Sequence, residues 1–198
     1  MEKLVIRKDV QLLTTNNFKT VKGEKLGVKT LILYLSPYKN NSKGKNLCPN
    51  ASAGCSKACL FGSGFGGMYE KVMNGRINKT EWFLSDRKGF MAKLVSEIET
   101  AIKRYSNEWV INIRLNGTSD IPFENIKVLG DKNIFEVFSN IQFYDYTKNA
   151  NRFNSELPSN YHLTFSRSEV NEDKAMKLLG LGYNVEIGRA SCRERVSS

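Results

Sequence analysis

The stretch Tyr161-His162-Leu163-Thr164-Phe165-Ser166 decides how this chain is expected to fold. Apolar and polar side chains alternate along it, which is typical of a strand with one buried and one polar face. A helical segment over 170–179, ended by Gly180, and a new strand beginning at Tyr183 follow it. Strands that alternate with helices are typical of β/α folds. We therefore expect parallel strands, although one-faced strands more often belong to antiparallel sheets.

Other segments extend this pattern. Residues 109–116 and 141–146 alternate in the same way, and the nearly continuous apolar run 28–35 indicates a buried parallel strand. Apolar residues spaced by three and four predict an amphipathic helix over 80–105, with Gly89 as a candidate break. The predicted fold class is α/β, a partial (β/α) barrel with parallel strands, truncated at its C-terminus.

The polar faces of these strands predict a ligand cavity. In a β/α barrel the apolar faces pack outward on helices and the polar faces point to the axis, near the carboxyl ends of the strands. The residues expected to line that axis are Asn112, Arg114, Asn116, Gln142, Tyr144, His162, Thr164 and Ser166.

Length and composition indicate one domain. The chain has 198 residues, of which 40% are hydrophobic and 25% charged, and we expect a single β/α domain over 1–185. No apolar run approaches the roughly 18 residues that a membrane helix needs. The N-terminus also lacks the pattern of a secretion signal. We therefore expect a cytoplasmic protein without a membrane partner.

Residues 186–198 are expected to be a non-native tail. The run from Glu186 to Val196 resembles the conceptual translation of a sequencing-library adapter. It follows Val185, where a strand is beginning, so the natural coding sequence is expected to be interrupted there. Without Cys192 three cysteines remain, and an odd number argues against disulfide pairing.

The net charge of +10 and the pI near 9.4 suit a polyanionic partner such as nucleic acid or a phosphorylated substrate. The positive residues are scattered, however, with only short clusters within 19–29 and 39–45. None is long enough for a nucleic-acid-binding arm. A solvated basic surface is the simpler explanation of the charge.

Three cysteines lie close together in a loop over 46–67 that follows the first predicted strand. Six residues separate Cys48 from Cys55 and three separate Cys55 from Cys59. Three thiolates there suit an iron–sulfur cluster with one iron open to substrate or cofactor, or a zinc ion with a fourth ligand. His162, the only histidine, is the candidate fourth ligand. The alternative is that the cysteines are buried as small hydrophobic residues.

Two further segments carry candidate binding residues. The glycines at 62, 64, 66 and 67 could bring backbone N–H groups to a phosphate, a carboxylate or a cofactor, or could form a simple connector. The turn 114–120 holds Ser119 and Asp120, either of which could instead cap a short helix. The predicted cofactor-binding residues are Gly62, Gly64, Gly66, Gly67 and Ser119. The predicted catalytic residues, which are polar and lie on or near strand ends, are Arg114, Asn116, Asp120, Tyr144, Asp145, His162 and Arg167.

Together these segments resemble the uncharacterised phage family named gene product 88. The resemblance covers about 13–185 and rests on Cys48-Pro49 with Cys55 and Cys59-Leu60, on 76–80, on 114–120, on 143–148 and on 160–168. It implies a phage or prophage origin and hence the cytoplasm of an infected or lysogenic bacterium. It also implies that the natural protein continues past Val185.

The cysteine loop is more distantly similar to that of radical S-adenosylmethionine enzymes, which use a partial β/α barrel. Their cysteines have three and then two intervening residues, whereas this chain has six and three. The similarity implies a [4Fe-4S] cluster and S-adenosylmethionine as cofactors.

Two functions follow as hypotheses. The first is an iron–sulfur enzyme, similar to the radical S-adenosylmethionine class, that acts on a nucleotide or a nucleic-acid-related substrate. The alternative is a zinc-stabilised, non-enzymatic module that binds nucleic acid or a host defence protein. An unfinished barrel would leave a strand edge exposed, so a homodimer through that edge is a further expectation.

Overall fold

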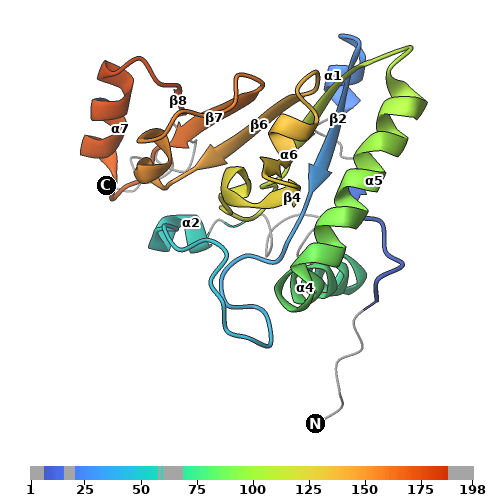
Figure 1. Ribbon diagram of the computed structural model, residues 1–198. Coiled ribbons are helices and arrows are strands. Elements are labelled where there is room, and N and C mark those ends of the chain that lie inside the picture. Colours follow the sequence, from blue (N-terminus) through green and yellow to red (C-terminus); the bar gives the residue numbers. More distant parts are fainter. Residues whose placement is uncertain (1–6, 16–20, 58, 60–68, 187–198) are drawn as a thin grey trace.

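The structure is a computed structural model that describes residues 7–15, 21–57, 59 and 69–186. Its centre is a six-stranded sheet of mixed direction (Figure 1). In spatial order the strands are β1 (Leu13–Thr14), β2 (Val28–Leu33), β3 (Val110–Arg114), β6 (Gln142–Thr147), β7 (Tyr161–Ser166) and β8 (Val185–Glu186).

Five of the six strands are parallel, as predicted from the sequence. β2 pairs with β3, β3 with β6, β6 with β7 and β7 with β8, all parallel, and only the short edge strand β1 is antiparallel. Strands that follow one another in the chain are therefore neighbours in the sheet, as in β/α barrels. The described sheet is open, so closure into a barrel stays a prediction. Glu186, the first residue of the expected tail, pairs with Ser166.

Helices connect these strands. Figure 1 shows α4 and α5 beside the β2 end of the sheet and α7 beside β8. The helices are α1 (Val21–Glu24), α2 (Ala53–Lys57), α4 (Glu70–Ser85), α5 (Arg87–Tyr105), α6 (Ile134–Val137) and α7 (Glu172–Gly180), with 3-10 turns η1 (Phe123–Asn125) and η2 (Ala150–Phe153) and a hairpin of β4 (Lys127–Leu129) and β5 (Lys132–Asn133). None of the helices in these ranges is long and apolar enough to cross a membrane.

The long predicted helix is two helices, and the break lies three residues before Gly89. Asp86 ends α4 and caps α5, because its carboxylate accepts a hydrogen bond of 2.9 Å from the backbone N–H of Gly89. An aspartate at this position satisfies a backbone donor that the first turn of a helix leaves free.

The alternation along the strands separates a buried face from a polar one. The buried face packs on helices, and Phe135 of α6 stacks on Tyr161 with ring centroids 4.0 Å apart and meets Phe143 edge-on at 4.9 Å. On the other face the side chains are half-buried or exposed; they include Asn112, Arg114, Gln142, Tyr144, Tyr146, His162, Thr164 and Ser166. Asn116, which was expected on this face too, is buried instead.

The core predicts a large effect for truncation of Phe143, which is fully buried at the centre of the sheet. Phe143→Ala should lower the free energy of unfolding by about 3–5 kcal/mol, because the cavity cannot collapse between β3 and β7. Leu129→Ala, at a side chain that is 67% exposed, should change it by less than about 0.5 kcal/mol. Urea unfolding followed by circular dichroism compares the two, and equal effects would contradict this packing.

Candidate functional site

The described part of the cysteine loop, residues 46–57 and Cys59, lies at the carboxyl edge of the parallel strands. Figure 1 shows α2, which carries Cys55, on the side toward which the β2 and β6 arrows point. Two backbone hydrogen bonds hold the loop. Leu47 N–H donates to the Tyr38 carbonyl at 3.2 Å, and Asp120 N–H donates to the Leu47 carbonyl at 2.8 Å. The loop is thereby fixed to the turn after β3, where β/α folds place their sites.

Cys48 is a half-buried free thiol that faces this turn. Its Sγ donates to the carbonyl of Thr118 at 3.4 Å. Burial raises the pKa of Cys48 to about 12, and the negative charges of Asp120, Cys59 and Cys55 act in the same direction. Cys48 is therefore a neutral thiol unless a cation takes the place of its proton.

Cys55 and Cys59 belong to the same cluster. Burial raises the pKa of Cys55, Cys59 raises it further, and the positive charge of Lys148 opposes both. Each thiol thus lies within electrostatic reach of the other two. Glu169, from the loop after β7, fixes α2 by accepting a hydrogen bond of 2.8 Å from Gly54 N–H.

Tyr38 lies near all three cysteines and was not among the predicted site residues. Its backbone N–H lowers the pKa of Cys48 and its hydroxyl lowers that of Cys55, while burial, together with Cys59 and Cys55, raises the pKa of Tyr38. Among the described non-glycine residues only Tyr38 has a positive φ, 56°. Such strained conformations persist where surrounding contacts enforce them, often at functional sites.

Thiols are suitable ligands for zinc and iron–sulfur centres, but the described residues contain no group of three His, Cys, Asp or Glu side chains that could hold a metal ion as they stand. A metal centre at the three cysteines therefore stays a prediction. The pKa shifts of Cys48 and Cys55 place the N–H and the hydroxyl of Tyr38 near their sulfurs. Hydrogen bonds to sulfur are a usual feature of iron–sulfur and zinc sites. His162 pairs with Tyr144 near the start of β7, four residues or about 13 Å before its end, and it does not join the cysteines.

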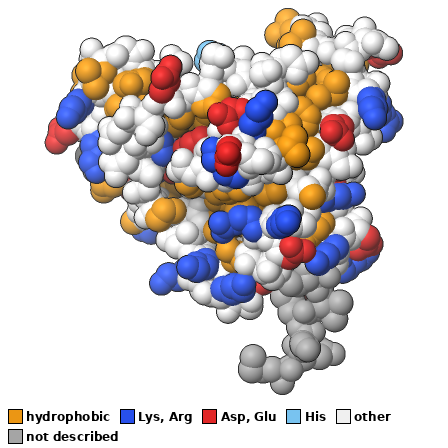
Figure 2. All heavy atoms as spheres, in the orientation of Figure 1, with side chains coloured by type: hydrophobic (Ala, Val, Ile, Leu, Met, Phe, Trp, Pro, Cys, Tyr) orange, Lys and Arg blue, Asp and Glu red, His pale blue; other side chains and the backbone are white. Residues whose placement is uncertain are grey.

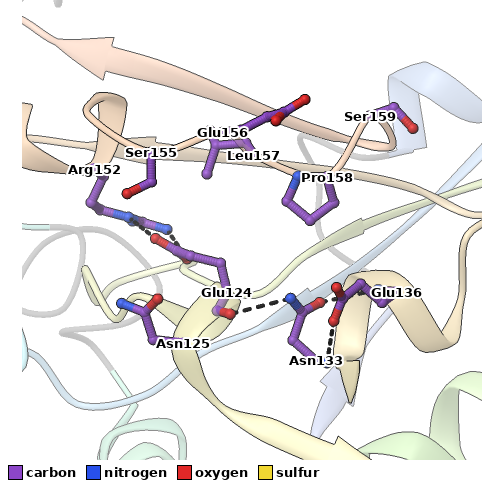
Figure 3. Close-up of a pocket in the computed structure, with 10 residues that line it drawn as sticks. All are labelled: Glu124, Asn125, Asn133, Glu136, Arg152, Ser155, Glu156, Leu157, Pro158 and Ser159. Carbon is purple, nitrogen blue, oxygen red and sulfur yellow. Dashed lines mark hydrogen bonds and ion pairs between the residues drawn. The ribbon is translucent and has the colours of Figure 1, made fainter. Parts of the chain in front are cut away.

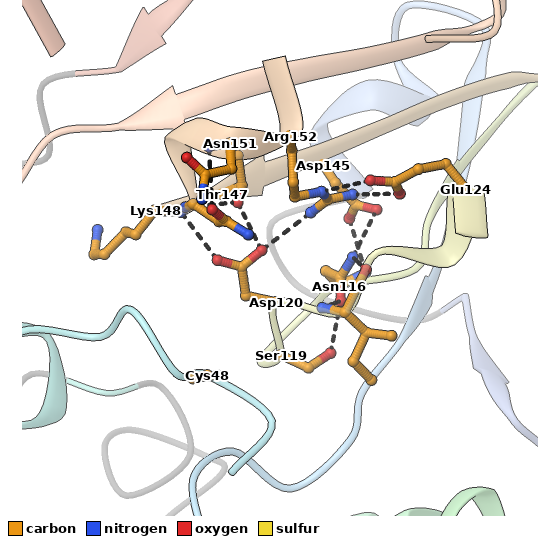
Figure 4. A network of polar contacts seen from close by, with 12 residues as sticks. Cys48, Asn116, Ser119, Asp120, Glu124, Asp145, Thr147, Lys148, Asn151 and Arg152 are labelled. Atoms are coloured by element: carbon orange, nitrogen blue, oxygen red, sulfur yellow. Dashed lines mark hydrogen bonds and ion pairs between the residues drawn. The ribbon is translucent and has the colours of Figure 1, made fainter. Parts of the chain in front are cut away.

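A buried polar network lies next to Cys48 (Figure 4). Arg152 of η2 is its centre: the guanidinium donates to both oxygens of Glu124 at 2.8 and 2.7 Å, to Asp120 at 3.0 Å and to the Tyr161 hydroxyl at 2.7 Å. Asp120 also accepts from Thr147 Oγ1 at 2.7 Å. Arg152 was not among the predicted site residues, because nothing near it in the chain distinguishes it from a surface arginine.

Asn116 and Asp145, two of the predicted catalytic residues, are buried in this network and hydrogen-bonded within it. Asp145 accepts from the backbone N–H of Asn116 at 2.7 Å, from its amide at 3.2 Å and from the Tyr161 hydroxyl at 3.2 Å. Ser119, predicted to bind a cofactor, donates to the Asn116 side-chain oxygen at 2.9 Å. These contacts shape the turn after β3, and catalytic or binding roles for these residues stay predictions.

The other predicted residues lie on the polar face or outside the described residues. Arg114 stacks on the ring of Tyr146 at 4.7 Å and lies beside Tyr144. Arg167, at the end of β7, forms an ion pair with Glu172 of α7. Lys148 donates to Ser166 Oγ at 2.8 Å. The four glycines from Gly62 to Gly67 fall outside the described residues.

A concavity of about 460 Å³ lies between η1, α6 and the loop 155–159 (Figure 3). Its charged lining consists of Arg152, which Glu124 already holds, and two more glutamates, Glu136 and Glu156. Glu136 accepts from Asn133 N–H at 2.7 Å in the cap of α6. The concavity holds no cysteine, and the sequence did not predict it.

The burial of Asp145 predicts how stability depends on pH. Burial raises the pKa of Asp145 from 3.8 to about 6, with Arg114 and the Asn116 hydrogen bonds opposing it. Between these two values the folded state binds more protons than the unfolded state, so this contribution to stability falls as pH rises. Relative to Asp145→Asn, the wild type should lose on the order of 2 kcal/mol of unfolding free energy from pH 4 to 6. Parallel pH series of urea unfolding test this, and a constant difference would contradict it.

Comparisons with known proteins assign this chain to a family. No curated protein and no solved structure matches this chain. A family model described as Gene product 88 matches residues 10–189, which includes the cysteine loop, the sheet and the buried network. The match covers most of the chain, which therefore belongs to the Gene product 88 family.

Proposed function

We propose that Cys48, Cys55 and Cys59 hold an iron–sulfur cluster and that the protein is an enzyme acting on a nucleotide-related substrate. The observation that supports the proposal is that three free thiols lie in one loop at the carboxyl edge of a parallel sheet, close enough to shift one another's pKa and that of Tyr38. Ligand sites of parallel β/α folds lie at this edge. The half-buried polar face of the sheet runs up to the same edge and would hold the substrate.

The residues around the thiols suit a negatively charged centre. Lys148 counteracts negative charge at Cys55, and Arg76 of α4 interacts electrostatically with Cys59. Three thiolates carry negative charge, so these cations would stabilise the ligated form. When bound, a cluster held by three cysteines supplies electron transfer and leaves one iron open to a further ligand. The cofactor proposed for that iron is S-adenosylmethionine. Tyr38 would orient the sulfurs and tune the cluster through its hydrogen bonds.

A zinc-stabilised module that binds nucleic acid or a host defence protein is the second candidate. Three thiols suit zinc equally well. The position of His162 toward the amino end of β7 speaks against a site with three cysteines and one histidine. A zinc site would then need a water or another residue as fourth ligand.

Metal analysis of anaerobically purified protein tests the proposal. Wild type should contain iron and acid-labile sulfide, and single Cys→Ser changes at 48, 55 and 59 should each remove most of both, because every thiolate is a ligand. Cys192→Ser, at the cysteine outside the described residues, is the matched control and should retain them. Protein with stoichiometric zinc and no iron would replace the first candidate with the second, and protein without either metal would contradict both.

Tyr38→Phe tests the hydrogen bonds to sulfur separately from ligation. The variant keeps the backbone N–H and the ring but loses the hydroxyl. The cluster should therefore still form, but a chelator should remove its iron about tenfold faster than from wild type. Tyr34→Phe, at a nearby tyrosine stacked under Arg76 at 4.8 Å, is the matched control. Equal rates of iron loss for Tyr38→Phe and wild type would remove Tyr38 from the site.

A further inference from the structure

Arg114 is held on the polar face of the sheet without using its hydrogen-bonding capacity within the described residues. Its side chain is 23% exposed. Its Nε is buried without a hydrogen-bond partner among the described residues. A buried guanidinium donor without an acceptor is costly, and such groups often mark a place for an absent partner.

Asp145 does not supply that partner. Its Oδ1 lies 4.0 Å from Arg114 Nε, which is too far for a hydrogen bond. Its two oxygens already accept from Asn116 and Tyr161. Asp145 therefore acts as a counter-ion beside Arg114. Nε is buried, but the exposed Nη groups of Arg114 remain available to a ligand on the open side of the sheet.

Aromatic side chains surround the guanidinium. Tyr146 lies under it at 4.7 Å, and Tyr144 meets Tyr146 edge-on at 6.4 Å. The Tyr144 hydroxyl lies near Thr30 of β2, which lowers its pKa against the raising effect of burial. Lys148 continues the same strand toward the cysteines and lowers the pKa of Cys55. The face thus offers a fixed planar cation and tyrosine rings beside the thiol cluster.

The chemistry of this face matches a nucleotide. A guanidinium binds phosphate through two parallel hydrogen bonds, and tyrosine rings stack on bases. A single nucleotide fits better than a nucleic-acid strand. On the face in Figure 2, Lys and Arg lie among acidic and apolar side chains rather than in one band, and Arg167 is already paired with Glu172.

We propose that Arg114 binds the phosphate of a nucleotide whose base lies against Tyr144 and Tyr146. This inference rests on the proposed function for the role of the nucleotide as substrate, but its binding step involves only residues of the sheet. Arg114 is thus assigned as the residue that selects a phosphorylated substrate over the corresponding nucleoside.

Isothermal titration calorimetry with the four common ribonucleoside 5′-monophosphates, adenosine and inorganic phosphate tests the inference. At least one monophosphate should bind with a stoichiometry of one, and adenosine and inorganic phosphate should each bind at least about tenfold more weakly, because each has only half of the contacts. Arg114→Gln should weaken binding of the monophosphate by at least about tenfold.

The chain provides a matched control at the other edge of the sheet. Arg104, in the last turn of α5, also stacks on a tyrosine, Tyr105, at 5.3 Å, and Arg104→Gln should leave binding unchanged. Arg114→Lys keeps a positive charge beside Asp145, so it is the variant to use if Arg114→Gln does not fold. Thermal unfolding shows whether each variant is folded. Arg114→Lys should bind the monophosphate more weakly than wild type, because a lysine cannot form two parallel hydrogen bonds.

The outcomes separate this inference from the proposed function. Monophosphate binding by wild type, lost in Arg114→Gln at unchanged iron content, supports the inference. Binding without any metal in the protein supports it while refuting the iron–sulfur proposal. Iron-containing protein that binds no monophosphate, or binds it equally well after Arg114→Gln, overturns the inference. An oligonucleotide that binds more tightly than the monophosphates, and equally tightly to wild type and Arg114→Gln, would also overturn the inference.

Discussion

The guanidinium of Arg152 joins segments that are distant in the chain, and the site depends on it. With its side chain only 3% exposed, it links Glu124 of η1, Asp120 of the turn after β3 and Tyr161 of β7. Through its backbone N–H, Asp120 then holds Leu47 next to Cys48. One buried cation thus fixes the turn that faces the cysteine loop.

Such a network has a small net effect on stability but a large effect on specificity of structure. The attraction between buried charges roughly offsets the loss of their hydration, whereas removing one partner leaves the other charge uncompensated. Arg152 faces two carboxylates and a phenol, so its absence would leave Asp120 and Glu124 in a poorly hydrated position. The arrangement therefore favours one geometry of the strand ends over alternatives that would separate these groups.

The sequence was sufficient for the five parallel strands. It did not predict β1 or the β4–β5 hairpin, and it was less informative about the site. The alternation over 161–166 is a local signal, and β7 has those bounds. The short helix α6 was missed because tertiary contacts of Phe135 stabilise it, although Asn133 and Glu136 form a capping box that is visible in the sequence. Tyr38 could not be predicted, since a positive φ at a tyrosine leaves no pattern in the sequence. Arg152 could not be predicted either, since its hydrogen-bond acceptors are distant in the chain. The grouping of the three cysteines into one metal site rests on their spacing in one loop and stays a prediction.

Asp120 connects the network to the thiols and shows how charge is balanced between them. Its negative charge contributes to raising the pKa of Cys48, and would therefore disfavour a thiolate there. Arg152, however, holds Asp120 on the side away from the cysteine loop, and Lys148 N–H takes its second oxygen at 3.0 Å. A carboxylate so occupied cannot turn toward Cys48 and become a metal ligand. For the metal site proposed above, the network would thus remove Asp120 as an oxygen ligand, which favours soft thiolate coordination over a mixed oxygen site.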